Sequence, residues 1–102
     1  MKVFLSPLAE EKLILLLDFL VSEWSQKVRN DFLKKFKKAI QQISEHPRSC
    51  TQSKQLDVFK CVVTKQCSFY YRIQQDEIEI ITVIDNRQDP KEIEKLLKRL
   101  SS

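Results

Sequence analysis

The polar segment Asp85 to Pro90, with the sequence Asp-Asn-Arg-Gln-Asp-Pro, holds the residue types most able to do chemistry. It follows directly after the mostly apolar stretch 78–84. Polar loops on the rim of a rigid sheet are where binding and catalytic groups usually lie. An arginine such as Arg87 can bind a phosphate or a carboxylate and stabilise developing negative charge. We therefore expect the candidate site at this loop.

The three cysteines, Cys50, Cys61 and Cys67, do not form a metal-binding pattern. Their number is odd, none are spaced as Cys-x-x-Cys, and the sequence contains a single histidine, His46. A zinc site is therefore not expected, and we predict no metal or other cofactor. The cysteines instead suit small buried positions in a reduced, cytoplasmic protein.

Three consecutive strands are expected to position the polar loop. Residues 57–64 form the first, and residues 67–74 the second, which alternates apolar and polar side chains like a half-buried strand. The polar break at 75–77 is short enough for a hairpin loop. Residues 78–85 form the third strand, which is apolar on both faces toward its end, as is usual for a central strand.

Two long helices are predicted between a first strand at residues 2–5 and these three strands. The first helix starts at Ser6-Pro7, where a serine N-cap precedes a proline at the first helical position. It carries so many apolar side chains that we expect cover on more than one side. The second helix runs from Ser25 to His46, and its opposite face is basic and expected to be solvated.

A last helix, from Pro90 to Leu100, is predicted by the capping box that starts at Asp89. Its apolar stripe is narrow. We therefore expect the helix to dock on the sheet through one side only and not to be buried all round. Helices separated from consecutive antiparallel strands indicate an α+β layer fold. The predicted order is strand, helix, helix, three-stranded antiparallel meander and C-terminal helix, with the helices packed on one face of the sheet.

Length and composition limit the classes of protein to consider. The 102 residues suit a single domain, 1–102, and 42% hydrophobic with 31% charged residues is an ordinary globular balance. The formal charge of +4, from 18 basic and 14 acidic residues, weakly favours anionic partners. The longest apolar run, Leu13 to Val21, contains Asp18 and is too short to span a bilayer, so no membrane role is expected.

The order of elements and several short segments resemble the RelE/ParE superfamily, the toxins of bacterial type II toxin–antitoxin systems. The matching segments are Val3 to Ala9, His46-Pro47, Phe59-Lys60, Tyr70 to Ile73 and Ile80 to Pro90. The likeness extends from Lys2 to about Leu97 and rests on the order and spacing of these segments together.

The resemblance implies a growth-inhibiting toxin of a plasmid-stabilisation or stress module. A cognate antitoxin would neutralise it within a toxin–antitoxin hetero-oligomer. Members similar to RelE cut messenger RNA in the ribosome, whereas those similar to ParE inhibit DNA gyrase. An inactive member would retain only antitoxin binding. The superfamily shares one fold, so the fold cannot choose among these alternatives.

For the alternative of a metal-independent mRNA endoribonuclease, the resemblance implies a set of basic groups on the concave face of the sheet. Their positions here are Lys60, Arg72 and Arg87. Together they would form one anion-binding patch that stabilises the negative charge of the transition state. The histidine or tyrosine that some nuclease members carry after the last strand is absent, and Tyr70, Tyr71 or Asp85 could take its place.

Each of these side chains also has an ordinary structural alternative. Arg87 can tie the polar loop to a nearby carboxylate such as Asp85. Arg72 lies where it can pair across the strands with Glu79. Tyrosines in strands more often pack in a core than transfer protons. The sequence leaves both sets of roles open.

Overall fold

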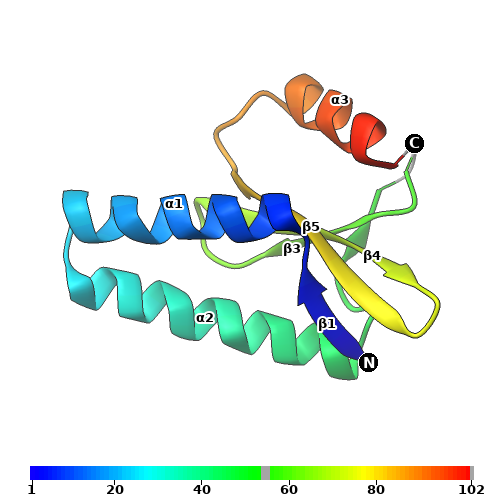
Figure 1. The fold of residues 1–102 in the computed structure, drawn as a ribbon, viewed down its shortest axis with the longest axis horizontal. Helices are drawn as coiled ribbons and strands as arrows, with labels where there is room; N and C mark the ends of the chain where they lie inside the picture. Colours follow the sequence, from blue (N-terminus) through cyan, green and yellow to red (C-terminus); the bar gives the residue numbers. More distant parts are fainter. Residues whose placement is uncertain (54–55, 102) are drawn as a thin grey trace.

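The computed structural model describes residues 1–53 and 56–101, and it arranges them as one sheet between two layers of helices (Figure 1). The elements in chain order are β1 (Lys2–Leu5), α1 (Pro7–Glu23), α2 (Gln26–Glu45), β2 (Thr51–Gln52), β3 (Phe59–Val62), β4 (Cys67–Gln74), β5 (Glu77–Asp85) and α3 (Pro90–Ser101). The predicted α+β class and order of elements are confirmed.

The sheet has the strand order β1-β5-β4-β3-β2. Strands β3, β4 and β5 form the predicted antiparallel meander, and β1 lies beside it, parallel to β5. The two-residue strand β2 was not predicted, because its residues fall in a polar stretch without periodicity. Between β4 and β5 the register shifts so that Tyr70 faces Thr82 and Tyr71 faces Ile80, which leaves Ile81 as a bulge residue.

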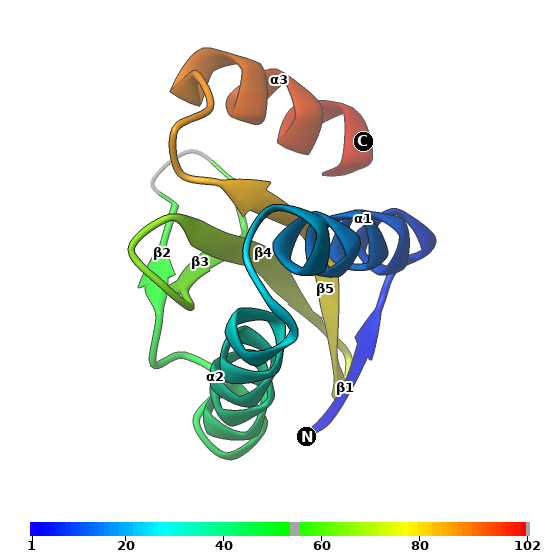
Figure 2. The same ribbon diagram turned by 90° about the vertical axis from the view of Figure 1, so that its left-hand side faces the viewer.

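Two apolar clusters hold helices to opposite faces of the sheet. Helices α1 and α2 pack on one face, where Phe36, Phe69 and Tyr71 are almost completely buried. On the other face Ile93 and Leu97 of α3 pack against residues that include Ile81 and Ile84 of β5. Figure 2 shows α3 above the sheet and α2 below it. The two long helices share one face as predicted, but α3 does not lie on that face.

The start of α1 is fixed by the serine predicted to cap it. The Ser6 hydroxyl accepts a hydrogen bond from the Ala9 N–H (3.0 Å) and donates one to the Ile81 carbonyl (2.7 Å). The cap therefore also joins α1 to the central strand. In the hairpin between β4 and β5, Gln75 has φ 54°, the left-handed region that glycine prefers and that this glycine-free chain fills with glutamine.

Helix α1 is not covered on more than one side, contrary to the sequence prediction. Ile14, Leu15 and Phe19 are 59%, 57% and 50% exposed, and Trp24, at the turn into α2, is 71% exposed. The apolar excess that suggested a second covering layer is instead an exposed surface. Among the described residues, no helix is both long enough and apolar enough to cross a membrane.

Candidate functional site

The polar loop after β5 is held together by its own arginine and carboxylate. Arg87 Nη2 lies 2.7 Å from Asp85 Oδ2, and Arg87 Nε donates to both carboxylate oxygens at 3.1 and 3.2 Å. The backbone N–H of Arg87 also donates to Asp85 Oδ1 at 2.8 Å. These hydrogen bonds lower the pKa of Asp85 and raise the pKa of Arg87. Arg87 thus takes the structural role that the sequence offered as its alternative.

Asn86 anchors the same loop to the turn between β3 and β4. Its side-chain oxygen accepts from the Ser68 hydroxyl (2.7 Å), and its amide nitrogen donates to the Lys65 carbonyl (3.2 Å). Its backbone N–H donates to the Gln66 carbonyl at 2.7 Å. The loop position is therefore set from a distant part of the chain, which no local sequence signal indicates.

Arg72 is paired with Glu79, as its structural alternative predicted. The two residues face each other across β4 and β5, and Arg72 Nε lies 2.7 Å from Glu79 Oε1. Their side chains are only 25% and 17% exposed, so solvent screens this pair less than the pair at the loop. A guanidinium held in this way has less freedom to bind a phosphate.

Tyr71 lies inside the core rather than on a reactive surface. Its ring stacks on Phe59 with centroids 5.1 Å apart, and its hydroxyl donates to the Pro47 carbonyl at 2.8 Å. Burial, with its contacts to Cys50, raises the pKa of Tyr71. In this position the hydroxyl fixes the chain after α2 and has no open path to a substrate, since Tyr71 is 0% exposed.

Lys60 lies on the opposite face of the sheet, beneath α3. It faces Tyr70 across β3 and β4, and both line a cleft of about 420 Å³ that is closed on one side by Ile93 and Leu97 of α3. Burial raises the pKa of Tyr70. Within the described residues, no carboxylate forms an ion pair with Lys60.

The predicted single anion patch is not formed. Lys60 lines the cleft beneath α3, while Arg87 lines a different groove beside the helical hairpin. Arg72 and Arg87 each hold a carboxylate of their own. The sequence could not show this, because the direction of the chain after Asp85 decides on which side Arg87 lies. Among residues 1–53 and 56–101 no cluster of three metal-ligating side chains occurs.

A second opening, larger than the cleft beneath α3, is a groove that the sequence did not predict, and we call it the hairpin groove. Its volume is about 790 Å³. Its apolar lining comes from Leu16, Phe19, Leu20, Trp24, Val28, Phe32, Cys67, Val83, Ile84 and Leu96, and its charged lining from Lys12, Asp31, Lys35, Asp85 and Arg87. The sequence signal for this groove is the unusually wide apolar face of α1, which by itself predicts a helix covered on more than one side.

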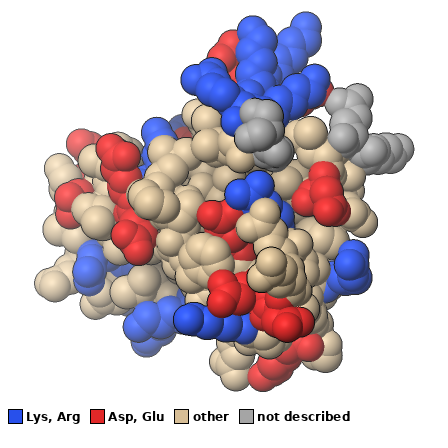
Figure 3. Space-filling view, turned by 45° about the vertical axis from the view of Figure 1, so that its right-hand side comes forward, with Lys and Arg blue, Asp and Glu red and all other residues tan. Residues whose placement is uncertain are grey.

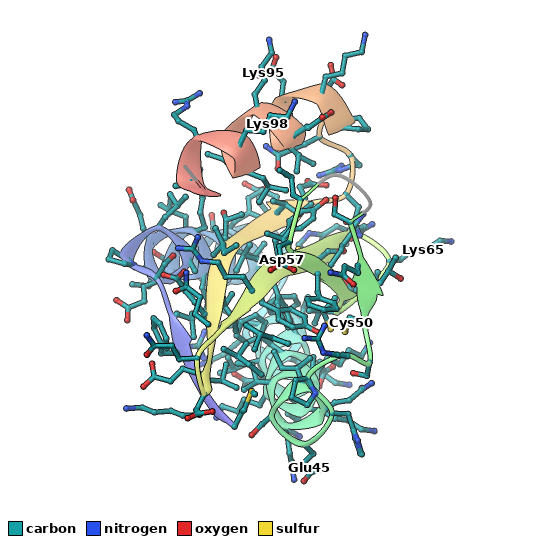
Figure 4. The ribbon with its side chains drawn as sticks, turned by 90° about the vertical axis from the view of Figure 1, so that its right-hand side faces the viewer. Glu45, Cys50, Asp57, Lys65, Lys95 and Lys98 are labelled. Carbon is teal, nitrogen blue, oxygen red and sulfur yellow. The ribbon has the colours of Figure 1, made fainter. Side chains whose placement is uncertain are left out.

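The lysines of α3 form a separate basic surface at the top of Figure 3. Lys95 points away from the sheet in Figure 4. Lys98 Nζ lies 3.2 Å from Glu94 Oε1, and Lys95 Nζ lies 4.0 Å from Glu92 Oε1, both as exposed pairs within the helix. Such pairs contribute little to stability, so these lysines remain accessible to an acidic partner.

Residues 3–90 match the family model described as ParE toxin of type II toxin-antitoxin system, parDE. The chain belongs to this ParE toxin family. The match ends where α3 begins, so almost all of α3 lies outside it. No curated protein sequence matches the chain significantly.

Solved structures share the fold of this ParE-family toxin. A chromosomal ParDE TA system from P. aeruginosa has a TM-score of 0.71 at 14% identity, covering 83% of this chain and 95% of that one. A YoeB/ParE toxin from Agrobacterium tumefaciens has a TM-score of 0.62 at 14% identity, covering 84% of this chain and 99% of that one. At such identities the likeness shows the fold, and the site has to be argued from its own residues.

Proposed function

We propose that this ParE-family toxin inhibits growth without catalysis, by binding a protein target, for which DNA gyrase is the candidate. The observation that carries the proposal is the hairpin groove, where Phe19 and Trp24 stay 50% and 71% exposed. Large aromatic side chains exposed beside an apolar groove are typical of protein-binding surfaces. The family match supports the toxin class to which this mechanism belongs.

The side chains that RNA cleavage would require are engaged elsewhere, which supports the same proposal. A nuclease needs cations free to stabilise negative charge and a group that can transfer a proton. Arg72 and Arg87 hold Glu79 and Asp85. The Tyr71 hydroxyl is enclosed in the core and bonded to a backbone carbonyl.

The partner that neutralises the toxin is, in this proposal, an acidic amphipathic segment of a cognate antitoxin that lies in the hairpin groove. Its apolar face would cover Phe19 and Trp24, and its carboxylates would meet Lys12, Lys35 and the basic surface of α2. Bound there, the antitoxin would exclude the target from the same surface. The resulting hetero-oligomer would form in the bacterial cytoplasm and keep the toxin neutralised there.

A second candidate function is a ribosome-dependent mRNA endoribonuclease that needs no metal. The observation in its favour is Lys60, which lines the α3 cleft beside Tyr70 without an ion-pair partner among the described residues. Its catalytic set would be Lys60, Arg72, Arg87, Tyr71 and Asp85. For that set to act, Arg72 and Arg87 would have to leave Glu79 and Asp85, and Tyr71 would have to leave the core beneath α1 and α2.

Induction of the chain in bacterial cells distinguishes these functions. DNA synthesis and protein synthesis are followed separately by pulse labelling, with and without the product of the adjacent antitoxin reading frame. We expect DNA synthesis to fall first, and co-expression of the antitoxin to restore it. Early arrest of protein synthesis with new messenger RNA 5′ ends would favour the nuclease. Normal growth would identify an inactive member that only binds antitoxin.

One variant sharpens this experiment. Lys60→Ala removes the one predicted catalytic cation that has no carboxylate partner among the described residues, and Lys60 is not among the residues that line the hairpin groove. We expect Lys60→Ala to inhibit growth as strongly as the natural sequence. Loss of inhibition by Lys60→Ala, with the fold intact by circular dichroism, would contradict the non-catalytic mechanism.

A further inference from the structure

Two of the three cysteines lie opposite each other at the end of the ladder between β2 and β3. That ladder pairs Thr51 with Lys60, and one further step in the same register places Cys50 opposite Cys61. Both belong to the apolar layer beneath α1 and α2, where Cys61 is buried and Cys50 is partly exposed. In Figure 4 Cys50 lies in this layer, close to yellow sulfur atoms.

The position of the pair in the ladder brings the two side chains close together. The Ser53 N–H donates to the Val58 carbonyl at 2.8 Å, which marks a hydrogen-bonded pair of the same register. Hydrogen-bonded and non-hydrogen-bonded pairs alternate along an antiparallel ladder, so Cys50 and Cys61, three steps away, occupy a non-hydrogen-bonded position. There the Cα atoms are about 4.5 Å apart, a separation that a disulfide spans.

The surroundings give the two thiols different reactivity. Burial, followed by a hydrogen bond with the Cys50 side chain, raises the pKa of Cys61 to about 12. Cys61 therefore stays protonated near neutral pH and does not react first. Cys50 is partly exposed, so it is the sulfur that an oxidant in solution reaches. Cys67 lies elsewhere, opposite Asp85 at the start of β4.

We propose that Cys50 and Cys61 form a modification site at which a peroxide closes an intrachain disulfide. Cys50 Sγ attacks one peroxide oxygen, the O–O bond breaks, and a sulfenic acid and water form. Cys61 then gives up its proton and its sulfur attacks Cys50 Sγ, so the S–O bond breaks and a second water leaves. The two thiols lose two electrons, and the peroxide accepts them. A small thiol reductant reverses the reaction by exchange.

The disulfide would tie the chain that follows α2 to strand β3. It closes the loop from residue 50 to residue 61 and so restricts the unfolded chain, which we expect to raise Tm by about 10 °C. Disulfides that form in reducing compartments are usually transient, so we expect this bond to open and close with the redox conditions rather than to be permanent. The proposal does not depend on the target of the toxin.

Peptide mapping tests the proposal directly. The reduced chain is treated with hydrogen peroxide, and its free thiols are alkylated before mass analysis. We expect the mass to fall by two hydrogen atoms, a linked peptide pair containing Cys50 and Cys61, alkylation of Cys67 alone, and full reversal by dithiothreitol. Three alkylated cysteines after peroxide, or a disulfide that includes Cys67, would overturn the proposal.

Single variants separate the pair from the third cysteine. Cys67→Ser should close the disulfide as the natural sequence does and gain the same increase in Tm. Cys50→Ser removes the partly exposed sulfur and keeps a side chain of similar size, and it should neither close a disulfide nor gain stability with peroxide. An equal increase in Tm for Cys50→Ser would show that the gain has another origin and would contradict the proposal.

Discussion

Replacing Trp24 by alanine should weaken antitoxin binding more than it weakens the fold. Trp24 is 71% exposed, and its backbone N–H still donates to the Leu20 carbonyl after the substitution. Of about 250 Å² of tryptophan surface, folding buries roughly 70 Å² and a partner in the groove can bury up to roughly 180 Å². At about 25 cal/mol per Å², these areas correspond to at most about 2 kcal/mol of folding and about 4 kcal/mol of binding free energy.

The expected change in Kd follows from these areas. Ordering of side chains and imperfect contact offset part of this binding free energy. We therefore expect Trp24→Ala to weaken binding by about 2–4 kcal/mol, which is a rise in Kd of roughly 30-fold to several hundredfold. Titration calorimetry with the purified antitoxin measures this change, and urea unfolding measures the cost to the fold. Growth inhibition by the variant should fall in parallel, because the target uses the same surface.

A matched control lies on α1, the helix that ends just before Trp24. Ile14 is 59% exposed but is not part of the hairpin groove, so Ile14→Ala should leave Kd within about threefold of the natural value. Equal losses of affinity for Trp24→Ala and Ile14→Ala would mean that the groove is not the binding surface. An unchanged Kd for Trp24→Ala would refute the reasoning outright.

Three further predictions concern the fold and the terminal helix. Tyr71→Phe removes the hydrogen bond to Pro47 and should cost about 1–2 kcal/mol of stability in urea unfolding. The variant should still inhibit growth, and a loss of inhibition would indicate a catalytic role for the hydroxyl. Gln75→Gly relieves a left-handed residue and should stabilise the chain by up to about 1 kcal/mol, so a lower Tm would contradict this interpretation of the hairpin. The apolar stripe of α3 is narrow, so residues 91–100 should exchange their amide hydrogens faster than β5, whereas equal protection of the two segments would contradict a weakly held α3.

Local signals in the sequence predicted every element except β2, and they offered the nearest partners of Arg72 and Arg87 as one of two alternatives. The cap at Ser6, the interior position of β5 and the start of α3 after Asp89 all depend on a few neighbouring residues, and the structure confirms them. The pairing of Arg72 with Glu79 follows from strand alternation, and the pairing of Arg87 with Asp85 from their separation by two residues.

What the sequence could not predict depends on how distant segments meet. Apolar periodicity counts the apolar side chains of α1, but it cannot tell whether another layer covers them, and so the exposed Trp24 and Phe19 were missed. The two-residue strand β2 exists only because β3 lies beside it. The separation of Arg87 from Lys60 arises because the loop after β5 is anchored by Asn86 to the turn before β4.

A supercoiling assay with purified DNA gyrase tests the central claim most directly. Increasing amounts of the chain are added to gyrase, relaxed plasmid DNA and ATP, with purified antitoxin and the Trp24→Ala variant as controls. The non-catalytic mechanism predicts that the natural chain blocks supercoiling and that antitoxin restores it. It also predicts that the Trp24→Ala variant inhibits supercoiling only weakly. Undiminished supercoiling, together with cleavage of messenger RNA on ribosomes by the same preparation, would contradict it.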